Sequence, residues 1–178
     1  MIGQTGGTAA IDVLGGDTDE ELRTRLSSCC AAEAWLTRVL AGRPYESEAA
    51  LLAASDAATA ELAPDGLAQA LAAHPRIGER ATTGAGDARS ESWSHGEQAK
   101  VIGAPIELIN ELAAANAAYE ERFGNVYLVC ATGRNAAELL AICQERLRND
   151  PETERSVVRR ELARINQLRL IKLLGEQR

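Results

Sequence analysis

The stretch Ala73–Gln98, AHPRIGERATTGAGDARSESWSHGEQ, organises the rest of the chain. It contains both histidines of the sequence, His74 and His95. Pro75 disfavours the α conformation of the residue before it, so a preceding helix is expected to end near His74. A histidine at such a helix end lies beside a loop, where side chains can meet a ligand. The spacing fits equally an incidental surface histidine between two helices, and both interpretations stay open.

The second half of this stretch predicts a loop followed by another helix. Ser94 and Glu97 have the S-x-x-E spacing of a capping box, which predicts that a helix begins after Ser94, behind a loop over residues 76–92. In this interpretation Glu97 folds back onto the helix start. The competing interpretation makes Glu97 a catalytic carboxylate, and periodicity alone favours the structural role.

Composition indicates one helical domain. The chain has 178 residues, a net charge of −7 and only 3% aromatic residues, and its abundant Ala, Leu, Glu and Arg favour helices over sheet. Basic residues are scattered, whereas phosphate binding needs a basic face, so nucleic acid is not expected as a partner. The start, MIGQTGGTAAIDVLGG, has neither a basic n-region nor a long apolar run, so no signal peptide or membrane anchor is expected.

Cysteine usage argues for a reduced, cytoplasmic protein without a metal. No pair of cysteines has the C-x-x-C spacing of a zinc or redox site, and two histidines are too few to suggest a metal centre. We expect all four thiols to be reduced and mostly buried. They are Cys29, Cys30, Cys130 and Cys143.

Hydrophobic periodicity predicts an all-α, single-domain multi-helix bundle over residues 17–178, after a flexible segment at residues 1–16. Residues 18–42 form one helix or two, and Thr18 with Glu21 reads as a capping box at their start. Further helices are expected at about 47–62, 67–73, 94–103, 106–123, 135–147 and 151–174.

One run is β-like, Val126-Tyr127-Leu128-Val129-Cys130-Ala131, and it stands alone. A lone strand has no partner for its backbone groups. We therefore predict a short extended, buried connector near residues 126–131. Its free N–H and C=O groups either bind a polar ligand or are satisfied by neighbouring loops and water.

The last helix contains a cation on its apolar face. At 100° per residue, Arg169 falls on the same helix face as Val158, Leu162, Ile165 and Leu173. A guanidinium pointed at a core needs a partner, because an unpaired buried charge is very costly. A structural ion pair with a core carboxylate, a side chain that reaches out to solvent, and a clamp for an anion or carbonyl all remain possible.

Eight short motifs, in this order and spacing, resemble the family of 2-oxo-4-hydroxy-4-carboxy-5-ureidoimidazoline (OHCU) decarboxylases, over about residues 12 to 175. The motifs are CCAAEAW at Cys29–Trp35, RPYES at Arg43–Ser47, AHPRIGE at Ala73–Glu79, SHGEQ at Ser94–Gln98, N-x-x-Y-x-x-R-F-G at Asn116–Gly124, VCATGR at Val129–Arg134, RLRND at Arg146–Asp150 and INQLRLIKLL at Ile165–Leu174.

The resemblance implies an all-helical, cofactor-independent and commonly homodimeric enzyme. Its expected reaction is decarboxylation of OHCU to S-allantoin in urate catabolism. The resemblance makes His74, Glu97 and Arg169 the catalytic residues. The substrate-binding residues that it implies are Pro75, Ser94, Gln98, Tyr127, Val129, Ala131 and Gly133.

The sequence also departs from the family pattern. Ala32 stands where the family often has Ser, which suggests a missing polar contact near a helix start. Asn125 and Tyr127 occur where a second Phe is common, and the Tyr127 hydroxyl would change the polarity of a pocket. These departures leave two alternatives to an OHCU decarboxylase. The chain could be a non-catalytic helical interaction module that kept the fold, or a decarboxylase of a related ureido acid.

Overall fold

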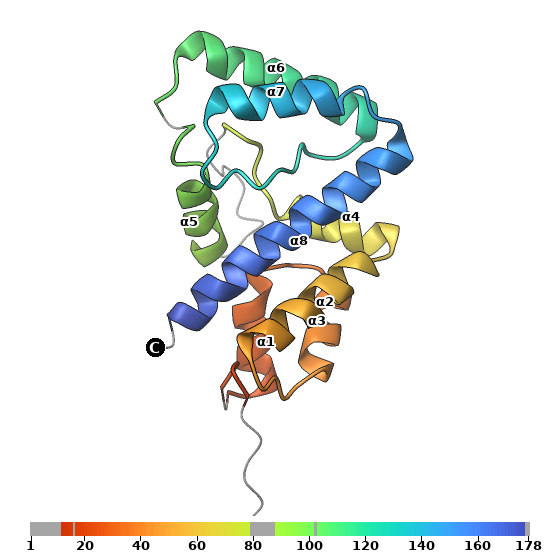
Figure 1. Ribbon diagram of the computed structural model, residues 1–178, viewed down its shortest axis with the longest axis vertical. Coiled ribbons are helices and arrows are strands. Elements are labelled where there is room, and N and C mark those ends of the chain that lie inside the picture. The colour runs from red at the N-terminus through yellow and green to blue at the C-terminus, as the bar shows by residue number, and fades with distance from the viewer. Residues whose placement is uncertain (1–11, 16, 79–87, 102, 177–178) are drawn as a thin grey trace, which may run out of the picture.

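The computed structural model describes residues 12–15, 17–78, 88–101 and 103–176. This described part is built of eight helices without a strand, which confirms the all-α prediction (Figure 1). None of these helices is long and apolar enough to cross a membrane. The helices are α1 (Asp19–Ser27), α2 (Glu33–Ala41), α3 (Glu48–Ala60), α4 (Pro64–Ala72), α5 (Ala88–Glu97), α6 (Ile106–Phe123), α7 (Ala136–Arg146) and α8 (Pro151–Gly175).

Residues 18–42 form two helices rather than one. The Thr18 capping box is present, since the N–H of Thr18 donates to the Glu21 carboxylate over 2.9 Å. Ala32 begins α2 without a side-chain cap. The amide oxygen of Gln69, from α4, instead accepts the N–H of Glu33 at 3.0 Å, so a neighbouring helix supplies the polar contact that the sequence suggested was missing.

Two helix starts differ from the prediction. The fourth helix begins at Pro64 and not at Leu67, because proline lacks only an N–H that the first turn leaves unpaired anyway. The fifth begins at Ala88, so Ser94 and Glu97 lie inside α5 and form no capping box. Both side chains bind Arg169 of α8 instead, a contact across the fold that local spacing cannot reveal.

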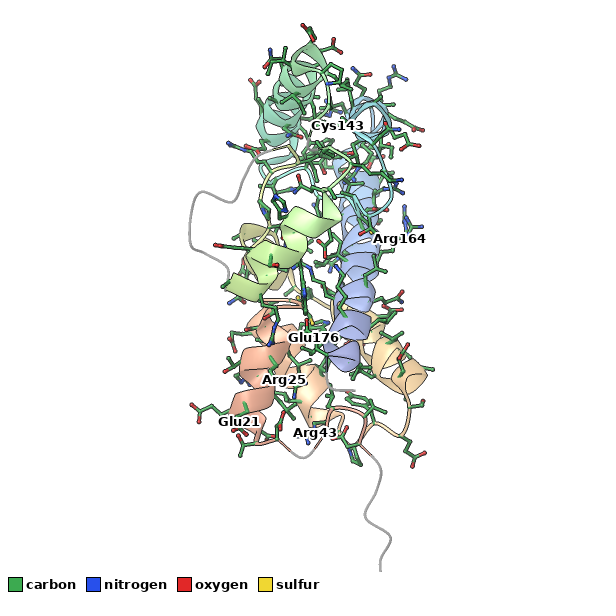
Figure 2. The ribbon with its side chains drawn as sticks, turned by 90° about the vertical axis from the view of Figure 1, so that its left-hand side faces the viewer. Glu21, Arg25, Arg43, Cys143, Arg164 and Glu176 are labelled. Atoms are coloured by element: carbon green, nitrogen blue, oxygen red, sulfur yellow. The ribbon has the colours of Figure 1, made fainter. Side chains whose placement is uncertain are left out.

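Two apolar clusters make up the core. One lies among α1–α4 and α8 and includes Trp35 and Leu162; the other lies between α6 and α7 and includes Leu112, Leu139 and Cys143. Figure 2 shows Cys143 near one end of the elongated molecule and Arg43 near the other. The long helix α8 runs diagonally through the molecule and links the two ends (Figure 1).

The predicted extended connector, residues 126–131, separates these two clusters. Leu128 belongs to the first cluster, whereas Tyr127, Val129 and Ala131 belong to the second. Side chains of an extended chain alternate between its two faces, so this segment covers one core with each face. Burial of both faces explains why a β-like run stands here without a partner strand.

The N-terminal segment was predicted to be flexible over residues 1–16. Of this range the structure describes residues 12–15, and they are held against the domain. Leu14 is fully buried in the first cluster, and the N–H of Val13 donates to the carbonyl of Tyr45 at 2.9 Å. Residues 1–11 and 16 lie outside the described part.

Candidate active site

His74 lies two residues beyond the end of α4, as Pro75 predicted. Its N–H donates to the carbonyl of Leu71 at 3.0 Å, which fixes the backbone. Its Nδ1 lies 2.9 Å from the carbonyl of Ala70. Because a carbonyl only accepts, Nδ1 carries the proton and Nε2 keeps a lone pair. Within the described part, Nε2 is buried and has no hydrogen-bond partner.

The surroundings keep this imidazole neutral. Burial, helped by the nearby Arg169 guanidinium, lowers the pKa of His74 to about 4, although the Ala70 carbonyl and the Glu97 carboxylate act in the opposite direction. Near pH 7 the side chain is therefore a neutral base with a free lone pair. A buried nitrogen without a partner is costly in a purely structural role, and it is expected where a ligand completes the site.

Arg169 faces the core, as the helical arc indicated, and its side chain is 2% exposed. Its Nε and Nη2 donate to the two oxygens of Glu97 over 3.1 and 3.0 Å, which makes a bidentate ion pair. Nη2 also donates to Ser94 Oγ at 2.9 Å, and Nη1 makes longer contacts with Ser28 O at 3.3 Å and Ser90 Oγ at 3.4 Å. All five N–H groups of the guanidinium are thereby engaged.

Glu97 contacts Arg169 rather than His74. Its carboxylate also receives Lys172, one turn further along α8, at 3.4 Å. No hydrogen bond joins Glu97 to His74 among the described residues. The structural ion pair that the sequence left open for Arg169 is therefore formed, and its partner is the other predicted catalytic residue.

These groups meet at one small cavity of about 20 Å³. His74, Glu97 and Arg169 line it together with six of the seven predicted substrate-binding residues. Ile77, Leu128 and Ile165 also line it, and no sequence pattern distinguishes these apolar side chains from ordinary core positions. The lining is His74, Pro75, Ile77, Ser94, Glu97, Gln98, Tyr127, Leu128, Val129, Ala131, Ile165 and Arg169.

Two predicted binding residues differ from expectation in detail. Gly133 does not line the cavity; it is exposed, and its carbonyl accepts from Lys100 at 2.9 Å. Tyr127 lines the cavity, but its hydroxyl donates to the carbonyl of Leu139 at 3.0 Å. That hydroxyl is occupied by α7 and does not set the polarity of the cavity.

Side chains also fix the segment that follows His74. The amide oxygen of Gln98 accepts the N–H of Gly78 at 2.8 Å, and no described residue accepts from the two donors on its nitrogen. The side-chain nitrogen of Asn116 donates to the carbonyl of Ile77 at 2.9 Å. Together these bonds hold residues 75–78 beside the imidazole.

The backbone of the extended connector is partly free. Side chains bind the carbonyl of Leu128 and both backbone groups of Cys130, and the carbonyl of Ala131 accepts from Arg134 N–H. The N–H and C=O of Val129 make no hydrogen bond with another described residue. Val129 lines the cavity, so its donor and its acceptor are among the backbone groups that the connector leaves unpaired there.

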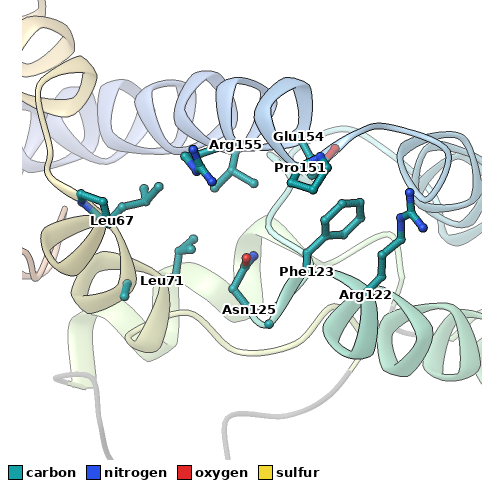
Figure 3. A pocket seen from close by; sticks show the side chains of 12 residues that line it. Leu67, Leu71, Arg122, Phe123, Asn125, Pro151, Glu154 and Arg155 are labelled. Atoms are coloured by element: carbon teal, nitrogen blue, oxygen red, sulfur yellow. The ribbon is translucent and has the colours of Figure 1, made fainter.

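A larger cavity, of about 270 Å³, lies between α4, the end of α6 and the start of α8 (Figure 3). Leu67, Leu71 and Phe123 give it an apolar wall, and none of the predicted site residues lines it. Size therefore does not mark the candidate active site, which is distinguished by its buried polar groups. Among the described residues no cluster of three His, Cys, Asp or Glu side chains is placed to hold a metal.

Fold and cavity together define a class: an all-helical domain with a small cavity that is lined by a neutral histidine and a buried Arg–Glu ion pair. The chain belongs to the OHCU decarboxylase family, whose family model matches residues 17–171.

Curated relatives agree with this assignment. The Uric acid degradation bifunctional protein TTL of Arabidopsis thaliana is 26% identical over 149 residues, which cover 84% of this chain and 46% of that protein. The 2-oxo-4-hydroxy-4-carboxy-5-ureidoimidazoline decarboxylase of Amia calva is 46% identical over 55 residues, which cover 31% of this chain and 31% of that protein. The matches thus span about half of the first relative and about a third of the second.

Solved structures show the same fold. A crystal structure of OHCU decarboxylase in the presence of (S)-allantoin aligns with a TM-score of 0.73 at 24% identity, over 89% of this chain and 99% of that chain. A crystal structure of (S)-allantoin synthase aligns with a TM-score of 0.66 at 17% identity, over 92% of this chain and 54% of that chain. At these identities the similarity concerns the fold.

Proposed function

We propose that this chain decarboxylates OHCU to S-allantoin in urate catabolism, without a cofactor. Family membership supplies the substrate class. The observation that carries the proposal is the unpartnered Nε2 of His74, a neutral base that lines the same cavity as the Arg169–Glu97 pair. Proton transfer and charge stabilisation are what such a decarboxylation needs from side chains.

The substrate carries a carboxylate and a hydroxyl on one ring carbon, next to an imine. When the bond to the carboxylate breaks, CO₂ leaves and the electron pair moves into the ring toward the imine nitrogen, which takes a proton from water. His74 Nε2 accepts the hydroxyl proton as that oxygen becomes a carbonyl. The imidazolium then returns the proton to one face of the neighbouring ring carbon, which gives a single enantiomer.

Arg169 and Glu97 act as a charged pair in this scheme. The Arg169 guanidinium offsets the negative charge that develops on the ring, and it binds a carbonyl or the ureido oxygen by releasing one of its longer contacts, with Ser28 O or Ser90 Oγ. The Glu97 carboxylate raises the pKa of His74, so it stabilises the imidazolium that forms during proton transfer. A cavity of about 20 Å³ holds about one water molecule, so substrate binding requires the lining side chains to move apart.

The test is circular dichroism of allantoin formation, with OHCU generated in solution from urate by urate oxidase and hydroxyisourate hydrolase. The wild type is expected to give one enantiomer rapidly, and His74→Ala is expected to lose this activity. His95→Ala is the matched control, because His95 is exposed on α5 and does not line the cavity. Slow racemic product from the wild type would contradict the proposal and favour a non-catalytic interaction module.

Glu97→Gln separates catalysis from structure at the ion pair. A loss of kcat greater than tenfold with a folded protein supports the proposed role. Loss of stability with an unchanged rate would leave Glu97 a structural partner of Arg169. A panel of related ureido acids, run with the wild type, distinguishes OHCU from the alternative substrates.

We further propose that the protein is a homodimer and acts in the cytoplasm, both on the strength of the family resemblance. Light scattering coupled to gel filtration tests the first: a mass of twice 19.0 kDa is expected. A mass of one chain across a hundredfold range of concentration would contradict it.

A further inference from the structure

A buried polar network lies against the extended connector, and neither Arg146 nor Glu154, its charged members, lines the small cavity. Arg146, at the end of α7, donates from Nε to Glu154 of α8 at 2.8 Å and from Nη2 to the hydroxyl of Tyr119 at 3.1 Å. Tyr119 also donates to Glu154, and Asn149 donates to the other carboxylate oxygen at 2.7 Å. Arg146 and Glu154 are 5% and 2% exposed, so this is a fully desolvated ion pair.

The network makes one hydrogen bond to the connector, besides the contacts of Arg146 and Tyr119 with the ring of Tyr127. Nη1 of Arg146 donates to the carbonyl of Leu128 at 2.7 Å. This carbonyl belongs to the same planar peptide unit as the N–H of Val129. In a trans peptide the C=O and the N–H point in opposite directions. By binding the Leu128 carbonyl on one side of the connector, Arg146 therefore orients the Val129 N–H toward the opposite side.

The carboxylate of Glu161 orients the next peptide unit, between Val129 and Cys130, as Arg146 orients the one before it. Oε2 of Glu161, on α8, accepts the N–H of Cys130 at 2.9 Å. That N–H shares its peptide plane with the carbonyl of Val129, which is thereby turned the opposite way. Glu161 is held in turn by Arg164 at 2.7 Å. Neither Arg146 nor Glu161 lines the cavity, whereas Val129 does.

From this geometry we propose that Arg146 and Glu161 are positioning residues for the substrate. They hold the two peptide units that flank Val129 from one side, so that its unpaired N–H and C=O form a preorganised donor–acceptor pair facing the cavity. The pair recognises a ligand edge that offers an acceptor beside a donor, as an amide or ureido group does. This statement of the ligand rests on the proposed function.

The side chains of Arg146 and Glu161 have the hydrogen-bonding groups needed to hold these two peptide units. The planar guanidinium binds Glu154 and the Leu128 carbonyl together, whereas a lysine ammonium cannot keep both contacts with the same geometry. At position 161 a glutamine still accepts the Cys130 N–H, whereas a methionine of similar size does not. Glu161→Met and Glu161→Gln are therefore a matched pair that differs in the hydrogen bond.

The experiment measures steady-state kinetics with OHCU and amide hydrogen exchange over residues 126–131. Glu161→Met and Arg146→Lys are expected to raise KM about tenfold, the loss of about one hydrogen bond to the substrate, and to speed exchange in the connector. Glu161→Gln is expected to stay within twofold of the wild type in both. Tyr119→Phe, which perturbs the network away from Leu128, is the control for a general loss of stability.

The outcomes separate this inference from the proposed function. If the wild type does not turn over OHCU, the proposed function fails, and faster exchange in Glu161→Met still supports the positioning of the connector. If the wild type is active and Glu161→Met matches Glu161→Gln in KM, the inference is overturned. Should Arg146→Lys not fold, the double variant Arg146→Gln with Glu154→Gln replaces it, because it removes both buried charges together.

Discussion

His74 is buried in its neutral form, and this burial has a consequence for stability. Its pKa is about 4 in the folded protein and near 6.5 when exposed, so between these values only the unfolded chain takes up the proton. The free energy of unfolding therefore falls as the pH drops from about 6.5 to 4. The loss due to His74 is about 3 kcal/mol over that range.

Urea unfolding of the wild type and His74→Gln between pH 4 and 7 measures this effect. Carboxylates titrate in the same range in both proteins, so the difference between the two curves isolates His74. We expect the wild type to lose about 3 kcal/mol relative to His74→Gln as the pH falls from about 6.5 to 4. His95→Gln should follow the wild type throughout, and a constant difference for His74→Gln would show that the imidazole is not held neutral.

Substitution of Tyr127 tests whether its hydroxyl contributes to stability or to substrate binding. Since the hydroxyl donates to the carbonyl of Leu139 and not into the cavity, Tyr127→Phe is expected to leave KM and kcat within twofold of the wild type. Loss of this buried hydrogen bond should lower the free energy of unfolding by about 1 kcal/mol. Kinetics and urea unfolding of the same preparation check both statements, and a large rise in KM would show that the hydroxyl binds substrate.

At the scale of elements, α7 depends on its first turn. Oδ1 of Asn135 accepts the N–H of Glu138 at 3.0 Å, and the Glu138 carboxylate accepts the N–H of Asn135 at 2.8 Å. Asn135→Ala removes this cap and should lower the free energy of unfolding by about 1 kcal/mol. Asn135→Asp keeps an acceptor there and should cost much less. Equal losses in the two variants, measured by urea unfolding, would mean that the cap contributes little.

The extended connector shows how one element serves two purposes. Its alternating side chains fill two cores, while its backbone is held by α7 and α8 from one side. An isolated strand is normally unstable because its backbone is unsatisfied. Here charged side chains bind the Leu128 carbonyl and both backbone groups of Cys130, and they leave the N–H and C=O of Val129 unpaired among the described residues.

At the scale of the whole molecule, the two apolar clusters are expected to unfold together. The connector contributes to both clusters, and α8 joins them through the buried pair of Glu154 with Arg146 of α7. Tryptophan fluorescence reports the first cluster, where Trp35 is fully buried. Alkylation of Cys143, identified by mass spectrometry, reports the second.

Both probes should give the same urea midpoint, as a single cooperative transition requires. Labelling of Cys143 at a lower urea concentration than the fluorescence change would show that the end of the molecule formed by α6 and α7 opens independently. In that case the candidate active site, which lies between the clusters, would be lost before the rest of the fold.

The sequence by itself determined the helical class, most helix boundaries and the family. These follow from local signals: the capping residues Thr18 and Asn135, the break at Pro75, and the apolar arc that contains Arg169. It also brought His74, Glu97 and Arg169 forward as one set, through the order of the family motifs. All three line the same cavity.

Only the tertiary structure decided how these residues are paired. The spacing of Ser94 and Glu97 predicted a local cap, whereas both bind Arg169, more than 70 positions away in the chain. Whether Gly133 faces the cavity, which atom of Tyr127 is free and which peptide groups Arg146 holds depend on contacts between helices distant in sequence. Local periodicity encodes which face of an element is buried, but the partner on that face is set by packing.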